Sequence, residues 1–343
     1  MKRKKRSTSD IISYLPSNVT ENILKDLPLR DAVRTSVLSR KWRYKWVTLP
    51  ELVINDKFFL EGWDDEKVKA VIYQVLLFHR GPLIKFTLRY PPFESCLDIN
   101  NWIFVLSTKN IQDFTFYLQG GLCHEIPCHF YSFMKLRDLN VAKCVFKPPP
   151  TFKGFSRLVN LIFVDVTISS EMRGLFISSC PLLERLQLTD CAAFDSLEIN
   201  APNLKYFGFF GIFESVSLEN TPCLAEISVT LVSWYTPLEQ PEEETDSEWV
   251  KFFRSLPAIE DMHLDRSFLE LQEVEIRHFS GADPEMLFVK ILLAYSVVLK
   301  KMVIWHEHEM SDKKGFAMVK ELTRFPRASS DAELIVDANV PTG

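Results

Sequence analysis

The sequence predicts an α/β fold, a solenoid of parallel strands preceded by a small helical module. Two observations predict it. Along most of the 343-residue chain, one spacing of apolar residues (apolar, two residues, apolar, one residue, apolar) recurs at intervals of roughly 20 to 28 residues. Residues 10–50 instead carry the start and stop signals of short helices. A helical segment followed by a long repeat region is therefore expected.

The spacing of residues 10–50 predicts three short helices. Ser17 can N-cap the first helix. Pro28 ends it, because a proline forces the residue before it out of the helical region. The second helix is expected to carry Ala32, Val33 and Val37 inward.

The third helix is the most aromatic part of this module. Ser39 can cap it, and Trp42 and Trp46 then lie on one side because they are four residues apart. A module of about forty residues cannot bury this much Leu, Ile, Val and Trp within itself. The surplus apolar surface must therefore meet another surface, on the same chain or on a partner.

The repeat region shows the leucine-rich repeat signature, whose period is roughly 20 to 29 residues. Each copy predicts one short strand, and neighbouring strands stack in parallel so that their apolar positions form a continuous core. We expect a curved horseshoe with a parallel sheet on its concave face. The copies are Leu83/Phe86/Leu88, Ile111/Phe114/Phe116, Leu136/Leu139/Val141, Leu158/Leu161/Phe163, Leu183/Leu186/Leu188, Leu204/Phe207/Phe209 and Leu224/Ile227/Val229.

The connections between these strands differ along the chain. Asp65 and Asp98 precede helical spacings, and Ser170 can cap a further helix. Residues 194–199 and 213–218 repeat the strand spacing halfway round a coil. We therefore expect helices in the early connections and short strands in the later ones.

Residues 239–248 (EQPEEETDSE) interrupt the repeat with an acidic run that predicts a solvated loop. Strand spacings resume at Ile259 and Leu271, which are only 12 residues apart. A complete coil needs about 20 residues to return to the same sheet. These two strands should therefore not be ordinary parallel neighbours.

The helical module resembles a plant-type F-box. The resemblance implies a trihelical domain that docks on the Skp-type adaptor of a cullin-based ubiquitin ligase. The matching residues are Leu15-Pro16, Ile23-Leu24, Leu27-Pro28, Asp31-Ala32-Val33-Arg34-Thr35-Ser36, Leu38-Ser39 and Trp42-Arg43-x-x-Trp46.

The remainder is similar to the plant F-box/FBD/leucine-rich-repeat family. The phrases CPLLERLQLTDC and LEINAPNLKYFGFF match its repeats, and VEIRHFSG, LLAYSVVLKKMVI, SDKKG and KELTRFPRASSDAELIV match its FBD region. One departure is Ser296-Val297, where the family has Ser-Pro. The expected boundaries are a basic disordered tail at 1–9, the F-box at 10–50, leucine-rich repeats at 51–264, the FBD region at 265–337 and a disordered tail at 338–343.

The resemblance implies a substrate-recognition subunit of an SCF-type (Skp, cullin, F-box) E3 ubiquitin ligase. The F-box would dock the adaptor, and through it cullin, while the repeats bind a target protein whose identity the sequence does not reveal. The residues expected to contact the adaptor are Leu15, Pro16, Ile23, Leu24, Leu27, Pro28, Val33, Leu38, Trp42 and Trp46.

Two alternatives remain open. The chain could be a non-ligase interaction module that binds the Skp-type adaptor without cullin. It could also be a small-molecule co-receptor, although no cluster of Arg and Lys on the strands indicates the basic pocket that such a function needs.

Composition excludes other classes. The hydrophobic fraction of 47% is sufficient for a large core, but no apolar run reaches the roughly 18 residues of a membrane span. A net charge of −5 gives no reason to expect nucleic-acid binding. Seven cysteines without a CxxC pair favour free thiols in a reducing compartment. The basic run at residues 2–6 is typical of a nuclear-localisation tract or of a solvated terminus, so we expect the nucleus, the cytoplasm or both.

No constellation predicts catalysis, a metal or another cofactor. Cys123-His124 and Cys128-His129 lack a second pair at zinc-site spacing. His306 and His308 lack a third ligand. There is no phosphate loop and no GxSxG motif, and the context of a nucleophilic cysteine is missing. The chain is therefore expected to be a non-catalytic subunit without cofactors.

Overall fold

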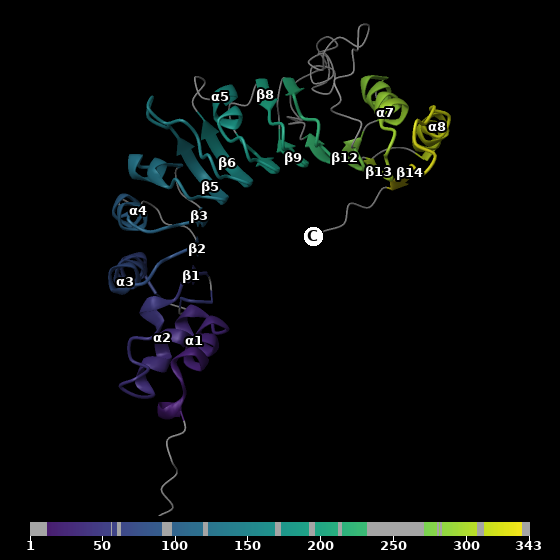
Figure 1. Ribbon diagram of the computed structural model, residues 1–343. Helices are drawn as coiled ribbons and strands as arrows, with labels where there is room; N and C mark the ends of the chain where they lie inside the picture. Colours follow the sequence, from purple (N-terminus) through teal and green to yellow (C-terminus); the bar gives the residue numbers. More distant parts are fainter. Residues whose placement is uncertain are drawn as a thin grey trace, which may run out of the picture. The chain divides into compact units, whose positions relative to one another are not determined.

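The computed structural model describes residues 12–55, 57–59, 63–90, 98–118, 123–168, 173–191, 196–211, 215–231, 271–279, 281, 283–306 and 312–337 (Figure 1). The chain forms two compact units. The first unit contains residues up to 122 together with 127–136. The second contains 123–126 and the chain from 137 onward.

The first unit begins with the helical module. α1 starts directly at Ser17, and Pro16 takes the N-cap position without a side-chain hydrogen bond. The expected Ser17 cap is therefore wrong, because the ring of Pro16 already sets a φ of −59° that suits helix entry. The elements are η1 (Ile12–Tyr14), α1 (Ser17–Lys25), α2 (Leu29–Arg34), η2 (Thr35–Val37) and η3 (Trp46–Thr48).

The expected third α-helix is also wrong. The backbone N–H of Trp42 donates to Ser39, and that of Lys45 donates to Trp42, so the bonds span three residues rather than four. These tight turns lead directly into η3. Aromatic and β-branched residues have low helix propensity, and Pro50 prevents extension of the helix.

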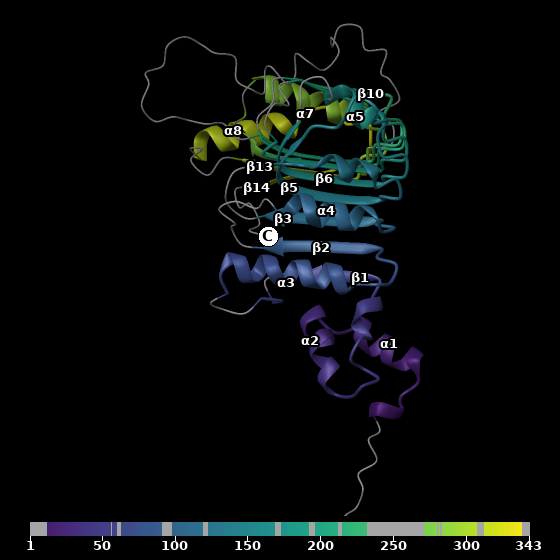
Figure 2. The same cartoon turned by 90° about the vertical axis from the view of Figure 1, so that its left-hand side faces the viewer.

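The rest of the first unit alternates strands and helices as predicted. The side chain of Asp64 caps α3 by accepting a hydrogen bond from the backbone N–H of Lys67 at 2.8 Å. The strands β1, β2 and β3 pair in parallel and lie one above another in Figure 2. The elements are β1 (Glu51–Ile54), α3 (Asp65–Phe78), β2 (Lys85–Tyr90), α4 (Ile99–Ser107), β3 (Asp113–Leu118) and η4 (Cys128–Ser132).

Alternation of side chains builds the core of this unit. Phe86 and Leu88 of β2 and Phe114 of β3 are buried, and the rings of Phe86 and Phe114 stack with centroids 5.8 Å apart. The helices add their predicted inward positions, including Ile72 of α3 and Trp102 of α4, both fully buried.

The second unit contains a longer parallel sheet, in which β4 pairs with β5 and the path continues β5-β6-β7-β9-β11-β12-β13-β14. Every strand pair described in it is parallel. The strands are β4 (His124–Glu125), β5 (Asp138–Phe146), β6 (Asn160–Ile168), β7 (Arg185–Thr189), β9 (Tyr206–Gly211), β11 (Glu226–Leu231), β12 (Glu273–Phe279), β13 (Lys301–His306) and β14 (Glu333–Asp337).

Register confirms the repeat interpretation. The middle apolar position of the template lies opposite its equivalent on each neighbouring strand, so one continuous apolar row results. The row is Leu139, Leu161, Leu186, Phe207, Ile227, Val274, Met302 and Leu334.

The connections change character as expected. α5 (Arg173–Ser178) is helical, whereas β8 (Ser196–Asn200) and β10 (Ser215–Glu219) pair in a separate two-stranded parallel sheet. α7 (Asp283–Tyr295) and α8 (Asp312–Leu322) return helices to the connections between β12, β13 and β14.

Several predictions fall outside the described residues: the tails at 1–9 and 338–343, the helix cap at Ser170, the acidic loop at 239–248 and the strand spacing at Ile259–Leu264. β12, which contains Val274, pairs directly with β11. Within the described part of the chain, no helix combines the length and the apolar character needed to cross a membrane.

Candidate adaptor-binding site

The ten residues expected to contact an adaptor divide into three groups by exposure. Those on the surface of the helical module are Pro16, Ile23, Pro28 and Leu38. Those that are half-buried are Leu15, Leu27 and Val33. Those in the interior are Leu24, Trp42 and Trp46. The structure therefore brings all ten into one small module but presents only part of the set to solvent.

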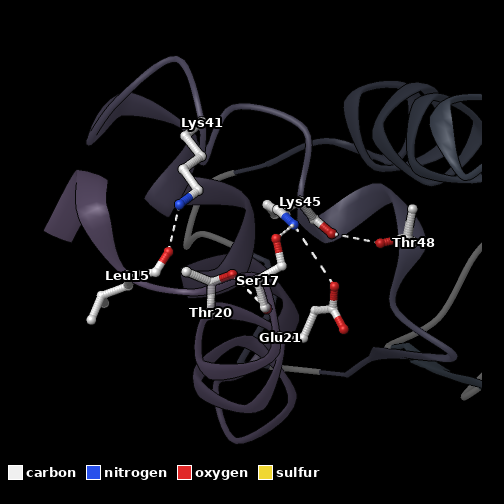
Figure 3. A network of polar contacts seen from close by, with 7 residues as sticks. All are labelled: Leu15, Ser17, Thr20, Glu21, Lys41, Lys45 and Thr48. Atoms are coloured by element: carbon white, nitrogen blue, oxygen red, sulfur yellow. Dashed lines mark hydrogen bonds and ion pairs between the residues drawn. The ribbon is translucent and has the colours of Figure 1, made fainter.

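The turn that carries Leu15 and Pro16 is hydrogen-bonded to the segment that carries Lys41 and Trp42, and Figure 3 shows the contact between Lys41 and Leu15. The Nζ atom of Lys41 donates to the main-chain oxygen of Leu15. The indole Nε1 of Trp42 donates to the main-chain oxygen of Ile12 at 3.1 Å. The adjacent side chains of Lys41 and Trp42 thus donate hydrogen bonds to the carbonyls of Leu15 and Ile12. The buried indole of Trp42 therefore helps to position the turn.

A second group of contacts holds the start of α1. Lys45 Nζ lies 3.2 Å from Ser17 Oγ and 3.7 Å from Glu21 Oε1. The hydroxyl of Thr20, which is buried, donates to the Ser17 carbonyl at 2.8 Å, and Thr48 Oγ1 donates to the Lys45 carbonyl at 3.0 Å (Figure 3). The exposed Pro16 is therefore fixed from both sides.

Sequence reasoning missed part of the exposed apolar surface. Val37 was expected inward but is 87% exposed. It lies in η2, where three residues per turn replace 3.6, so the inward face of α2 is not continued. Val19 lies four residues before Ile23 and so shares its face of α1, whereas Tyr14 and Tyr44 belong to no helical spacing. The additional exposed residues are Ile12, Tyr14, Val19, Val37 and Tyr44.

The exit of the module is bonded to the loop after α3. The backbone N–H of Arg80 donates to the Val47 carbonyl at 2.9 Å. A Cβ on Gly81 would come within 3.0 Å of the Cα and O atoms of Thr48, so only glycine fits there without a shift.

A buried histidine completes this junction. His79 Nε2 lies 2.8 Å from the Leu49 carbonyl oxygen, and its Nδ1 has no partner among the described residues. Burial lowers the pKa of His79, and the nearby Lys109 lowers it further, against the opposing effect of the bond to Leu49. The imidazole is therefore held in its neutral form, with Nε2 donating.

A pocket of about 460 Å³ lies beside this junction. Its walls are the turn between α1 and α2, including Pro28, and the strand β1 with Phe58 after it. Leu27 and Pro28, both expected to contact the adaptor, line it. The pocket therefore belongs to the same surface.

All the cysteines that the structure describes are free thiols. Cys144, Cys180 and Cys191 are buried free thiols, and Cys123, Cys128 and Cys223 are exposed ones. Burial raises the pKa of Cys180 and of Cys191 to about 11, so both stay protonated at neutral pH. Within the residues that the structure describes, no group of three or more His, Cys, Asp or Glu side chains could hold a metal ion.

Comparison with known proteins decides the family. Residues 12–53 match the F-box domain, and residues 99–241 match the LRR repeats of FBD-associated F-box protein At5g56370. The chain is 36% identical over 321 residues to the F-box/FBD/LRR-repeat protein At1g13570 of Arabidopsis thaliana, an alignment that covers 86% of this chain and 76% of that protein. This chain belongs to the plant F-box/FBD/LRR-repeat family.

Two further relatives are less similar to this chain than At1g13570 is. The F-box/LRR-repeat protein At3g26922 of Arabidopsis thaliana is 29% identical, over 65% of this chain and 83% of that protein. The F-box/FBD/LRR-repeat protein At3g52680 is also 29% identical, over 52% of this chain and 40% of that protein. The predicted resemblance is thus confirmed in its F-box, leucine-rich-repeat and FBD parts. An F-box domain implies binding of a Skp-type adaptor, and F-box/LRR proteins are typically non-catalytic.

Proposed function

We propose that this chain is the substrate-recognition subunit of an SCF-type E3 ubiquitin ligase. The helical module docks the Skp-type adaptor, which connects it to cullin, and the repeat region holds a target protein. The observation that carries the proposal is the exposed apolar surface of a module that matches the F-box domain. Apolar surface of this kind on a small helical domain is typical of a protein interface.

Direct contact is assigned to the surface residues of the predicted set. Pro16, Ile23, Pro28 and Leu38 are exposed, and Leu15, Leu27 and Val33 are reachable at their edges. Each fully buried apolar side chain contributes roughly 1.5 to 3 kcal/mol, so a few of them are sufficient for tight binding.

The interior residues Leu24, Trp42 and Trp46 have a positioning role in this proposal. Trp42 holds the turn before Pro16 through the Ile12 carbonyl. Replacing it would loosen the docking surface without removing a contact atom from it.

The subunit makes and breaks no bond. Its contribution to ubiquitin transfer is proximity, because holding the target near the charged enzyme raises the effective concentration of the two reactants. The free thiols with raised pKa values are consistent with this division of work.

The second candidate is an adaptor-bound module that does not recruit cullin. The same apolar surface on the F-box supports it, since that surface concerns the adaptor alone. The two candidates differ only in what the adaptor carries.

Affinity purification separates these candidates. The tagged full chain is co-expressed with the adaptor and a cullin, beside the double variant Leu15→Ala/Pro16→Ala and the control Leu77→Ala, which removes an exposed leucine from α3. The proposal predicts that wild type and control retain both partners and that the double variant retains neither. Adaptor without cullin supports the non-ligase module. Retention of adaptor by the double variant contradicts the assigned docking surface.

A further inference from the structure

An arginine and a tyrosine form a stacked pair on the solvent-facing side of the sheet in the second unit. Arg185 of β7 and Tyr206 of β9 are direct neighbours in register. Both alternate with buried residues, Leu186 and Phe207, so their side chains lie on the side opposite the core. The pair therefore lies on the side of the repeat that is open to a partner.

The stack is close. The guanidinium carbon of Arg185 lies 4.1 Å from the centroid of the Tyr206 ring. A similar pair in the first unit, Arg89 over Tyr117, has a separation of 5.2 Å. At 4.1 Å the guanidinium gains a cation–π contact that holds its plane.

Gly208 allows this arrangement. A Cβ built on Gly208 would lie 2.7 Å from the Tyr206 hydroxyl oxygen, so the tyrosine ring lies along its own strand over the glycine. Tyr206 is half-buried as a result, and burial is the main cause of its raised pKa. The platform under Arg185 is therefore built into the strand rather than formed by a mobile side chain.

Arg185 differs from nearby Lys and Arg side chains, which form ion pairs with glutamates. Arg277 donates to Glu275 at 2.8 Å, and Lys205 pairs with Glu184 at 2.9 Å. Within the described residues, the guanidinium of Arg185 forms no ion pair. Its donors are oriented by the stack but are not paired with an anion.

We propose that Arg185, stacked on Tyr206, is a subsite that binds the side-chain carboxylate of an acidic residue in the target protein. This inference rests on the proposed function, which assigns target binding to the repeats. A planar guanidinium presents parallel N–H donors that match the two oxygens of a carboxylate. Stacking reduces the freedom that the side chain must lose on binding.

The surrounding charges favour a carboxylate over a phosphate group. Across the sheet, Glu226 of β11 is the register partner of Tyr206, and Glu273 of β12 is the register partner of Glu226. Both repel an incoming anion, so they favour a ligand whose single negative charge Arg185 alone can neutralise over a phosphate that would keep an excess charge near −1. One unpaired guanidinium compensates a single negative charge.

The test uses the full chain bound to its adaptor and a library of random linear peptides displayed on phage. Peptides that bind are resynthesised, and their dissociation constants are measured for wild type, Arg185→Gln, Arg185→Lys and the control Arg157→Gln. Arg157 is an exposed arginine, and its replacement makes the same change of charge elsewhere in the second unit.

The expected result is enrichment of Asp- or Glu-containing peptides, with binding weakened about tenfold or more by Arg185→Gln and hardly at all by Arg157→Gln. Arg185→Lys should give an intermediate loss, because the charge remains while the fork is lost. Replacing the acidic residue of the peptide by Asn or Gln should have no further effect on the Arg185→Gln variant.

Three outcomes overturn the inference: no enrichment of acidic peptides, equal losses with the two Gln variants, or phosphoserine peptides that bind tenfold more tightly than their carboxylate counterparts through Arg185. Failure of the proposed function is a separate result, because it appears as loss of adaptor binding by the wild-type chain before any peptide is added.

Discussion

The helical module and the strands β5, β6 and β7 differ in how far their large apolar side chains are exposed to solvent. Within residues 12–50, seven large apolar side chains are at least 36% exposed, and Val37 reaches 87%. Among the described residues of β5, β6 and β7, no large apolar side chain is exposed, and Phe163 and Leu186 are fully buried. One region leaves its apolar surface open, whereas the other covers its own.

The difference follows from how each region is built. A repeat strand has a neighbour on both sides, so alternation places its apolar residues in a shared core. A module of a few short helical segments has too little volume for its apolar residues. Under the proposed function the roles divide in the same way, with apolar docking assigned to the module and polar recognition assigned to the solvent-facing side of the sheet.

The largest effect should come from breaking the sheet's core. Phe163→Ala removes a ring that lies 5.5 Å from Phe146 and 5.9 Å from Phe176. Loss of burial and the resulting cavity should lower the free energy of unfolding by about 3 to 5 kcal/mol, as measured by urea denaturation. Phe210→Ala, at a ring that is 37% exposed, is the matched control. Similar losses for the two variants would mean that the core is not where the structure places it.

A smaller effect is expected where the module meets the first repeat. Gly81→Ala places a methyl group 3.0 Å from backbone atoms of Thr48, which cannot rotate away. Overpacking of this kind costs about 1 to 3 kcal/mol, so the melting temperature of the chain should fall. An unchanged melting temperature would show that the junction is loose and that the module is not fixed to the repeat.

The smallest effect concerns pH. The pKa of His79 is below its ordinary value of 6.5 because the side chain is buried. The unfolded chain therefore binds a proton first as the pH falls, and stability that is fully present above about 6.5 is lost as the pH drops toward the folded-state pKa.

His79→Gln keeps a donor for the Leu49 carbonyl but does not titrate. Urea denaturation between pH 7 and pH 5 should show less loss of stability for this variant than for wild type. Equal pH dependence of the two proteins would exclude His79 as the source.

Much of the fold could be predicted because it depends on local spacing. The buried positions of α3 and α4, the strands at Leu139 and Leu186, and the change from helices to β8 and β10 all follow from periodicity. Register is then fixed because a slip by one residue would expose every core side chain.

Other features have no signal of this kind. Lys143, Asp165 and Asp190 have positive φ angles of 55°, 52° and 49°, although none is glycine. Asp190 donates its N–H to the Phe210 carbonyl, so the next strand stabilises a conformation that the residue itself disfavours. Such tertiary effects are invisible in local spacing.

For the candidate site, the identity of the module could be predicted from the sequence, but the exposure of its individual residues could not. Residue order in Leu15-Pro16 and Trp42-x-x-x-Trp46 identifies the module. The exposure of each residue depends on whether the local turns are α-helical or 3₁₀. Both Val37 and Trp46 lie in 3₁₀ turns, where Val37 is exposed and Trp46 is buried. A match to a family motif does not separate residues that contact a partner from residues that shape the contact.

The central claim is that the exposed apolar residues of the module, and not exposed apolar residues in general, bind the adaptor. Titration calorimetry of the purified Skp-type adaptor against Ile23→Ser/Leu38→Ser, with Leu77→Ser/Leu182→Ser as the control, tests it directly. All four side chains are between 38% and 55% exposed, so folding should be little affected in either variant. We predict that the first variant loses affinity by at least a hundredfold, because two apolar contacts of roughly 1.5 kcal/mol or more are removed, and that the control binds as wild type does. Equal affinities for the two variants would contradict the account.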